Sequence, residues 1–242
     1  MKDWPIYIPS KGRPNSKIFG ELPTSIIVVE PQDIDAYKET NKNKIIKLDK
    51  NNQGIRYVRQ YILDLNRDQQ NKWFWMIDDD LTATYLNNYP SKPKKIEIKK
   101  ALAYAEASIS GAKHLGQVAL EYQQFSWASK KNFSSQSYCD CVVGINTLNT
   151  IGINYRPVDI KEDRDFTLQV LSAGYGTTRL SRIGFKVPKN GSNKGGLFEE
   201  YAKKRRELEA VDEMVRLWPG VVSKQIKKDG RIDCKIDWSV FK

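Results

Sequence analysis

Short runs of β-branched and aliphatic residues alternate with amphipathic stretches along the first third of the chain. Four such runs predict strands, at residues 6–8, 25–29, 44–48 and 73–77. Helices are expected between them, one at 31–40 and one where apolar residues recur at helical spacing, at Ile55, Val58, Ile62 and Leu65. Strands that alternate with helices in this way are typical of a layered α/β fold with a largely parallel sheet.

The rest of the chain adds further elements. Strands are predicted at 117–122, 139–145 and 231–238, and helices at 98–112, 161–173 and 199–217. The last strand follows Lys228-Asp229-Gly230, a sequence typical of a hairpin turn. Residues 87–95 and 126–137 are expected to be loops because of their polar composition. We therefore expect an α/β, Rossmann-like domain over residues 1–198, with a C-terminal helix and β-hairpin extension over 199–242 packed on it.

The apolar run at 73–77 ends abruptly in three carboxylates, Asp78, Asp79 and Asp80. Ligands of such sheets collect at the carboxyl ends of the strands, and adjacent buried carboxylates repel one another, so a cation is expected there. Asp78 and Asp80 form a D-x-D pair whose hard oxygens suit Mg²⁺ or Mn²⁺ holding a diphosphate. The alternative is a solvated acidic loop, but the five apolar residues before it favour the cation site.

The charge indicates the kind of partner, and the cysteine content indicates the cellular compartment. The 242 residues carry 40 Lys and Arg against 29 Asp and Glu, a formal charge of +11, which makes nucleic acid the first candidate partner. The three cysteines and one histidine do not have the spacing of an ordinary zinc site or a disulfide framework, which favours a reducing compartment. The chain has no run of 18 apolar residues, so we expect a cytoplasmic protein that does not span a membrane.

Two basic segments have a functional and a plain structural interpretation. The loop after the first strand suits a nucleotide base or a diphosphate, or is an ordinary β-turn; it contains Pro9, Ser10, Gly12 and Arg13. A later helix presents its first-turn amides, with Arg56 and Arg59, to an anion, or has only a solvated basic face.

Two further segments are equally open to interpretation. Residues 161–166 place three acids at a helix start, where the helix dipole stabilises carboxylates. One of these acids would alternatively act as a general base, and the acid at position 165 is expected to be a helix-start or solvent charge. Residues 189–196 are basic and rich in glycine, and they form either a lid over phosphates or an ordinary loop.

Four motifs taken in order resemble a known family. They are IPSKGRP after the first strand, GIRYVRQYIL on a helix, WMIDDDL at a strand end and KEDRDFTLQVLSAG on a later helix. Together they resemble the GT-A-fold nucleotide-sugar transferases. The similarity is greatest to the phage TET-associated glycosyltransferases, which attach sugars to hydroxymethylated pyrimidines in DNA, and the arabinosyl-hydroxymethylcytosine transferases are a specific relative. It spans residues 5 to about 198.

The resemblance implies an enzyme of GT-A fold that moves a hexosyl or pentosyl group from a UDP-sugar to hydroxymethylated DNA. It implies Mn²⁺ or Mg²⁺ bound by Asp80 and Asp78, and Asp163 as the base of an inverting displacement. The lone His114 lies outside these motifs, so either donor phosphate and water supply the remaining metal ligands or the metal does not bind tightly without the donor. The nucleotide-sugar pocket would be lined by Pro9, Ser10, Gly12, Arg13, Arg56, Arg59, Asp78, Asp79, Lys194 and Gly195.

A DNA acceptor in turn implies a cytoplasmic setting in a host cell during phage infection. The residues expected to bind DNA are Lys94, Lys95, Lys99, Trp127, Lys203 and Arg205. Three alternatives stay open: a GT-A transferase that acts on polysaccharide, lipid carrier or protein, a two-metal nuclease, and a non-catalytic DNA-binding module. The nuclease would use Asp78, Asp80, Glu162 and Asp163, whereas the binding module leaves the acid triplet unexplained. The sequence carries no signal for the oligomeric state.

Overall fold

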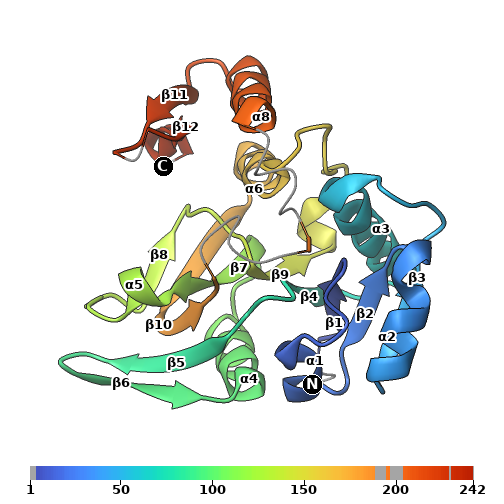
Figure 1. Ribbon diagram of the computed structural model, residues 1–242. Coiled ribbons are helices and arrows are strands. Elements are labelled where there is room, and N and C mark those ends of the chain that lie inside the picture. Colours follow the sequence, from blue (N-terminus) through green and yellow to red (C-terminus); the bar gives the residue numbers. More distant parts are fainter. Residues whose placement is uncertain (1–3, 189–194, 197–203, 229, 242) are drawn as a thin grey trace.

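The computed structural model describes residues 4–188, 195–196, 204–228 and 230–241. Its centre is a ten-stranded sheet in the order β3-β2-β1-β4-β9-β7-β10-β5-β6, with β8 paired to β10 (Figure 1). The strands are β1 (Ile6–Pro9), β2 (Ile26–Val29), β3 (Lys44–Lys47), β4 (Trp73–Ile77), β5 (Ala83–Asn88), β6 (Ser91–Ile96), β7 (Leu115–Tyr122), β8 (Phe133–Ser135), β9 (Val142–Asn146) and β10 (Gly176–Lys186). Strands β1 to β4 are mutually parallel, as are β7 and β10, whereas β9 runs antiparallel between β4 and β7.

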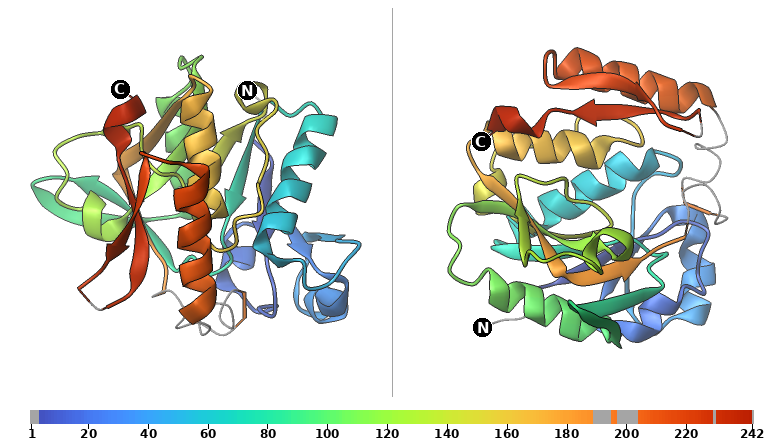
Figure 2. Two further views of the ribbon diagram at one scale, coloured as in Figure 1. Left: turned by 90° about the horizontal axis from the view of Figure 1, so that it is seen from above. Right: turned by 90° about the vertical axis from the view of Figure 1, so that its left-hand side faces the viewer.

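Helices cover both faces of this sheet. They are α1 (Lys17–Glu21), α2 (Ile34–Thr40), α3 (Gly54–Asp68), α4 (Ile98–Ser108), α5 (Gln123–Ser126), α6 (Glu162–Ser172) and α8 (Lys204–Leu217), with short 3₁₀ turns at Pro31–Asp33, Leu148–Thr150 and Trp238–Phe241. Strand β4 explains the two layers, because its apolar side chains alternate between the faces. Trp75 packs with α1 and α4 in one core cluster, and Phe74 packs with α3 and α6 in the other. The layers are visible in Figures 1 and 2. The predicted α/β architecture with a mostly parallel sheet is confirmed.

The prediction of a loop at residues 87–95 is wrong. This segment forms most of the β5–β6 hairpin, which extends the sheet through antiparallel pairing of β5 with β10. Strand β6 is the last strand in the sheet order, and an edge strand tolerates Pro93 and exposed lysines because half of its backbone groups need no partner. The short strand β8 lies within the other predicted loop, and the long strand β10 was missed altogether.

The C-terminal part adds α8 and a hairpin of β11 (Val222–Ile226) and β12 (Ile232–Ile236). These elements pack on α6 through a third core cluster, in which Val211 and Met214 of α8 contact Leu168 of α6. In Figure 2 they form an outer layer over α6. The predicted domain boundary at 198/199 and the predicted helix start at 199 lie outside the described residues, and the boundary stays a prediction. The expected turn residue Asp229 also lies outside them.

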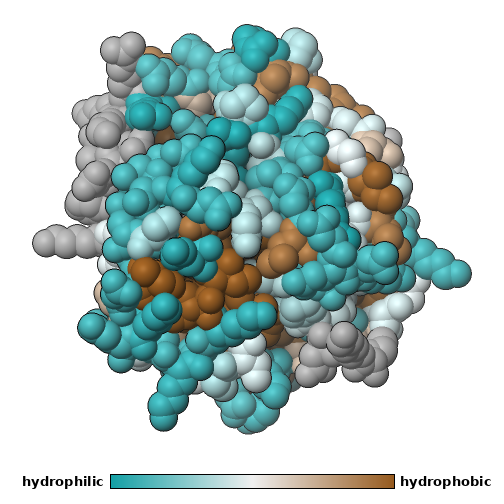
Figure 3. All heavy atoms as spheres, turned by 90° about the vertical axis from the view of Figure 1, so that its right-hand side faces the viewer, coloured by the Kyte–Doolittle hydropathy of each residue, from teal (hydrophilic) through white to brown (hydrophobic). Residues whose placement is uncertain are grey.

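On the side of α2, α3 and β3 the surface is mostly hydrophilic, with apolar side chains gathered in limited patches (Figure 3). Strand β3 ends the sheet on this side and begins and ends in an exposed lysine, which discourages edge-to-edge pairing with another chain. Within the described residues, no helix is long and apolar enough to cross a membrane.

Candidate active site

The carboxyl ends of the parallel neighbours β1 and β4 bring two predicted segments together. Asp79, the second residue after β4, is only 5% exposed. One of its carboxylate oxygens accepts a hydrogen bond from Ser10 Oγ (2.5 Å), and the other is paired with Arg13 Nη1 (2.5 Å). The middle acid of the triplet therefore ties the loop after β1 to the end of β4, whereas the side chains of Asp78 and Asp80 are 27% and 24% exposed.

Tyr37 of α2 fixes the same loop from a second side. Its hydroxyl lies 2.6 Å from Ser10 Oγ and accepts a hydrogen bond from the Arg13 backbone N–H (2.9 Å). Burial raises the pKa of Tyr37 to about 12, so the phenol stays protonated at neutral pH. Arg13 also donates to the carbonyl oxygen of Gly195 (3.1 Å), which unites two of the predicted pocket segments. Lys194, the other predicted residue there, lies outside the described residues.

Arg59 links the acid triplet to the start of α6. It is only 5% exposed, and its guanidinium pairs with Asp78 Oδ1 through Nη2 (3.0 Å) and with Glu162 Oε1 through Nε (3.0 Å). Burial raises the pKa of Asp78 to about 6, with a further contribution from Asp80, although Arg59 opposes the shift. This arginine is therefore a bridge inside the site rather than part of a solvated helix face. Its neighbour Arg56 is half-buried, and its Nε has no hydrogen-bond partner within the described residues.

The first turn of α6 presents Asp163 in a fixed orientation. One carboxylate oxygen accepts a hydrogen bond from Tyr138 OH (2.8 Å), and the other accepts one from the Arg164 backbone N–H (2.7 Å). The Tyr138 ring lies between two guanidinium groups, those of Arg164 and Arg179, each 5.2 Å from its centroid. Burial raises the pKa of Asp163, and Asp140 raises it further. Such a carboxyl group takes up a proton more readily than an exposed aspartate, which suits a general base.

Asp140 is a member of this site that the sequence interpretation missed. It is 3% exposed and accepts hydrogen bonds from Tyr122 OH (2.6 Å) and Arg179 Nη2 (2.6 Å). Its neighbour Cys141 accepts a backbone hydrogen bond from Asp78 N through its carbonyl oxygen (2.7 Å), so the segment lies beside the acid triplet. The sequence feature that could have identified Asp140 is its position between two cysteines at the start of a predicted strand.

A family comparison gives this arrangement its context. Residues 4–196 match the family model described as TET-Associated Glycosyltransferase. The chain belongs to this family. The match covers the whole site, from the loop after β1 to Gly195, and ends before α8. No curated protein matches the chain.

Several solved structures have the same fold as this chain. The crystal structure of S. aureus TarS 1–349 in complex with UDP-GlcNAc superposes with a TM-score of 0.54 at 14% identity, covering 88% of this chain and 66% of that chain. A second crystal structure of S. aureus TarS 1–349 gives a TM-score of 0.51 at 13% identity, with 88% of this chain and 65% of that chain covered. A mycobacterial protein gives a TM-score of 0.56 at 6% identity, with 96% and 82% covered. This chain therefore spans about two thirds of the TarS fragment, and it has the GT-A fold.

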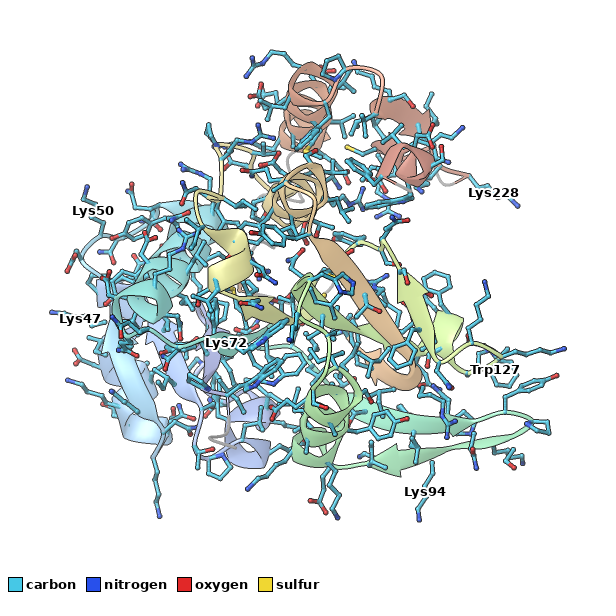
Figure 4. The ribbon with its side chains drawn as sticks, turned by 180° about the vertical axis from the view of Figure 1, so that it is seen from behind. Lys47, Lys50, Lys72, Lys94, Trp127 and Lys228 are labelled. Atoms are coloured by element: carbon cyan, nitrogen blue, oxygen red, sulfur yellow. The ribbon has the colours of Figure 1, made fainter. Side chains whose placement is uncertain are left out.

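The described residues expected to bind DNA lie on other elements than the acid triplet. Lys94 and Lys95 are exposed on β6, and Lys99 is exposed near the start of α4. Trp127, directly after α5, is 56% exposed and lies on the same side of the molecule as Lys94 (Figure 4). Lys203 and the Arg205 side chain lie outside the described part of the chain.

The expectation that Asp165 is a helix-start or solvent charge is wrong, because Asp165 is fully buried. Its carboxylate accepts hydrogen bonds from Arg156 Nε (2.9 Å), Gln169 Nε2 (2.8 Å) and Trp218 Nε1 (2.8 Å). We therefore expect Asp165→Asn to lower the free energy of unfolding by roughly 3 kcal/mol, since it removes the charged acceptor from several donors. Chemical denaturation measures this loss.

The matched control for Asp165→Asn is Asp159→Asn. Asp159 precedes α6 and is paired with Arg206, but its side chain is 56% exposed. An exposed pair contributes little, so this variant should unfold within about 0.5 kcal/mol of the wild type. Equal stability of the two variants would contradict a structural role for Asp165.

Proposed function

We propose that this protein transfers a sugar from a UDP-sugar to the hydroxymethyl group of a modified pyrimidine in DNA, with help from a divalent cation. The observation that carries the proposal is the arrangement around Arg59, which holds Asp78 at the end of β4 beside Glu162 and Asp163 at the start of α6. A pair of acids that would bind a cation and a candidate base would thus act together at the carboxyl edge of the sheet, in a member of a glycosyltransferase family. The TarS structure with UDP-GlcNAc supports a UDP-sugar as the donor.

The donor set at the end of β4 fits a hard cation. Asp78 and Asp80 offer carboxylate oxygens, the ligand type that Mg²⁺ and Mn²⁺ prefer. Their mutual repulsion contributes to the raised pKa of Asp78, and a cation would relieve it. Within the described residues no group of three or more His, Cys, Asp or Glu side chains is arranged to hold a metal ion, so donor phosphate and water would complete the shell. When bound, the cation neutralises charge on the departing nucleoside diphosphate.

The chain's own residues divide the remaining work. Ser10 and Arg13, fixed by Asp79 and Tyr37, would contact the nucleotide, and the unpartnered Nε of Arg56 would donate to a phosphate oxygen. Asp163 would take the proton of the acceptor hydroxyl. The oxygen of that hydroxyl would then bond to the anomeric carbon while the bond between this carbon and the phosphate oxygen of the donor breaks. One displacement of this kind inverts the anomeric configuration.

The DNA acceptor is supported by the family and by the formal charge of +11. Such a reaction would take place in the cytoplasm of an infected host cell. The direct test incubates hydroxymethylated DNA with Mn²⁺ and a panel of UDP-sugars, followed by mass spectrometry of the nucleosides. A glycosylated hydroxymethylpyrimidine is expected. Nicking of plasmid DNA without any sugar donor would favour the nuclease alternative. Transfer only to a polysaccharide or protein would show that DNA is not the acceptor.

DNA affinity should fall steeply with salt, with a log–log slope of about −0.9 for each phosphate contact. The variant Lys94→Gln/Lys95→Gln should weaken binding. It should also make the slope less steep, by up to the contribution of about two phosphate contacts. Its matched control is Lys47→Gln/Lys50→Gln, which removes the same charge from the other side of the molecule (Figure 4). Fluorescence anisotropy over a salt titration checks both. A slope near zero in the wild type, or equal slopes for the two variants, would contradict this DNA surface.

Cation and donor binding should depend on pH through Asp78, whose pKa burial raises from 3.8 to about 6. Between these values the unfolded chain releases this proton while the folded protein retains it, so the folded state loses stability as pH rises to about 6, and the loss is then complete. Because a cation binds the ionised carboxylate, Mn²⁺ with UDP should raise the melting temperature more at pH 8 than at pH 5. Equal shifts at both pH values would remove Asp78 from the cation site.

A further inference from the structure

A pocket of about 570 Å³ opens beside the acid triplet, at the carboxyl ends of β7 and β10. Thr82, which lines it, follows Asp80 by two residues, and its backbone N–H and hydroxyl both donate to the carbonyl oxygen of Lys186 (2.8 and 3.0 Å). Tyr122 also lines the pocket, and its hydroxyl donates to Asp140 (2.6 Å). The pocket therefore adjoins the segment of the acid triplet and, through Tyr122, Asp140, and none of the described residues assigned to the donor lines it.

The walls of this pocket are largely aromatic. The rings of Tyr122 and Phe185 lie 4.5 Å apart at an angle of 40°, and Trp127 completes the lining with 56% of its surface exposed. Phe125, 63% exposed, stands edge-on to Tyr122 beside it. Exposed aromatic side chains at the rim of a concave site are typical of ligand stacking, and nucleobases present flat aromatic faces to such rings.

Hydrogen bonds hold the segment that carries Trp127 in place. Ser126 Oγ donates to the carbonyl oxygen of Ser181 (2.6 Å) and accepts a hydrogen bond from the Asn87 amide. Asn87 Oδ1 in turn accepts one from Gln123 Nε2 (3.3 Å). Gln123 packs against Gly184, where any Cβ would collide with its carboxamide. These contacts fix the short α5 between β5 and β10, so the aromatic wall is formed before any ligand arrives.

We propose that this pocket receives the acceptor pyrimidine after it has left the base stack of the DNA, with its ring against Trp127 and its hydroxymethyl group toward the acid triplet. A base inside a duplex cannot reach a recessed active site, so it must be turned out of the helix. Lys186 in the pocket wall and the exposed lysines of the neighbouring β5–β6 hairpin, Lys94 among them (Figure 4), would contact phosphates of the same strand. The inference rests on the proposed function and adds the place and state of the acceptor base.

The test compares Trp127→Ala with Tyr104→Ala. Tyr104 lies on α4, is 39% exposed and does not line the pocket, so it serves as a control for loss of an exposed aromatic ring. Loss of one base stack should raise the acceptor KM of Trp127→Ala by about 5- to 150-fold and leave the dissociation constant for UDP unchanged. Trp127→Phe, which keeps a ring, should recover most of the affinity. Thermal melting of each variant identifies any that fails to fold.

Binding to mismatched DNA tests whether the base leaves the stack. A mismatch at the target weakens the stacking and pairing of the target base. The wild type should therefore bind a mismatched duplex with an affinity at least about 10-fold higher than a matched one, and Trp127→Ala should lose this gain. Equal affinity of the wild type for both duplexes would overturn the inference, as would equal acceptor KM values for Trp127→Ala and Tyr104→Ala. Sugar transfer to DNA by the wild type is scored separately, because its absence refutes the proposed function itself.

Discussion

Asp80→Asn is expected to reduce sugar transfer by roughly 10³-fold, because it removes a cation-binding charge that helps the nucleoside diphosphate to depart. The substitution preserves volume, and the side chain is 24% exposed and lies 3.4 Å from Arg13 Nη1. Folding should therefore be almost unaffected, with a melting temperature within about 2 °C of the wild type. Initial rates at saturating Mn²⁺, measured together with thermal melting, check both halves of this expectation.

Asp79→Asn is the matched control for Asp80→Asn. It makes the same change one residue away, but Asp79 is buried and ties Ser10 and Arg13 to the end of β4. We expect this variant to melt at a lower temperature, since a buried charged acceptor is lost. The two variants thus separate loss of cation binding from loss of structure. Full activity of Asp80→Asn would remove the cation site from this protein.

Asp163→Asn should lower turnover by roughly 10²- to 10⁴-fold while leaving donor binding intact, as expected for the loss of a general base. An asparagine still accepts one of the two hydrogen bonds that orient Asp163, from Tyr138 or from the Arg164 amide, so the local fold should persist. Single-turnover rates of transfer and calorimetric titration with UDP separate the two effects.

Glu162 is the rival carboxylate for this role. It is 3% exposed, and burial raises its pKa to about 7, with Asp163 adding to the shift. Its pairing with Arg59, however, suggests that it neutralises a buried guanidinium. Glu162→Gln should therefore destabilise the protein more than Asp163→Asn does. An active Asp163→Asn together with a folded but inactive Glu162→Gln would assign the base to Glu162, and the inference of inversion from Asp163 would lose its support.

The parts of this site that the sequence predicted are those with local signals. Five apolar residues before Asp78 indicated a buried strand that ends in acids, and β4 is that strand. The role of Arg59 as a bridge was not predictable, because its partner Glu162 lies 103 positions away and only tertiary packing brings them together. Asp165 was misjudged for the same reason: one of its donors, Trp218, follows 53 positions later.

The β5–β6 hairpin shows a different limit. Its lysines and prolines are typical of a loop, and they are accommodated in a strand only because β10 pairs with β5 and leaves β6 at the sheet edge. The strand β10 itself was missed because its residues, from Gly176 to Lys186, mix apolar and polar side chains without simple alternation. Burial on both faces of the sheet selects such a strand, and that burial depends on neighbours that are distant in sequence.

Helix α6 bears the candidate base on its first turn and also bears the contacts that seat the C-terminal elements. Arg164, adjacent to Asp163, pairs with Asp233 of β12 (2.6 Å), while Asp165 accepts a hydrogen bond from Trp218. A chain cut where the family match ends would remove Asp233 from Arg164 and one of the hydrogen-bond donors from Asp165, directly beside the candidate base. The C-terminal segment therefore cannot be exchanged independently of α6. Replacing it with the segment of a relative would require matching changes on α6, and sequence variation in the C-terminal segment and in α6 should be correlated.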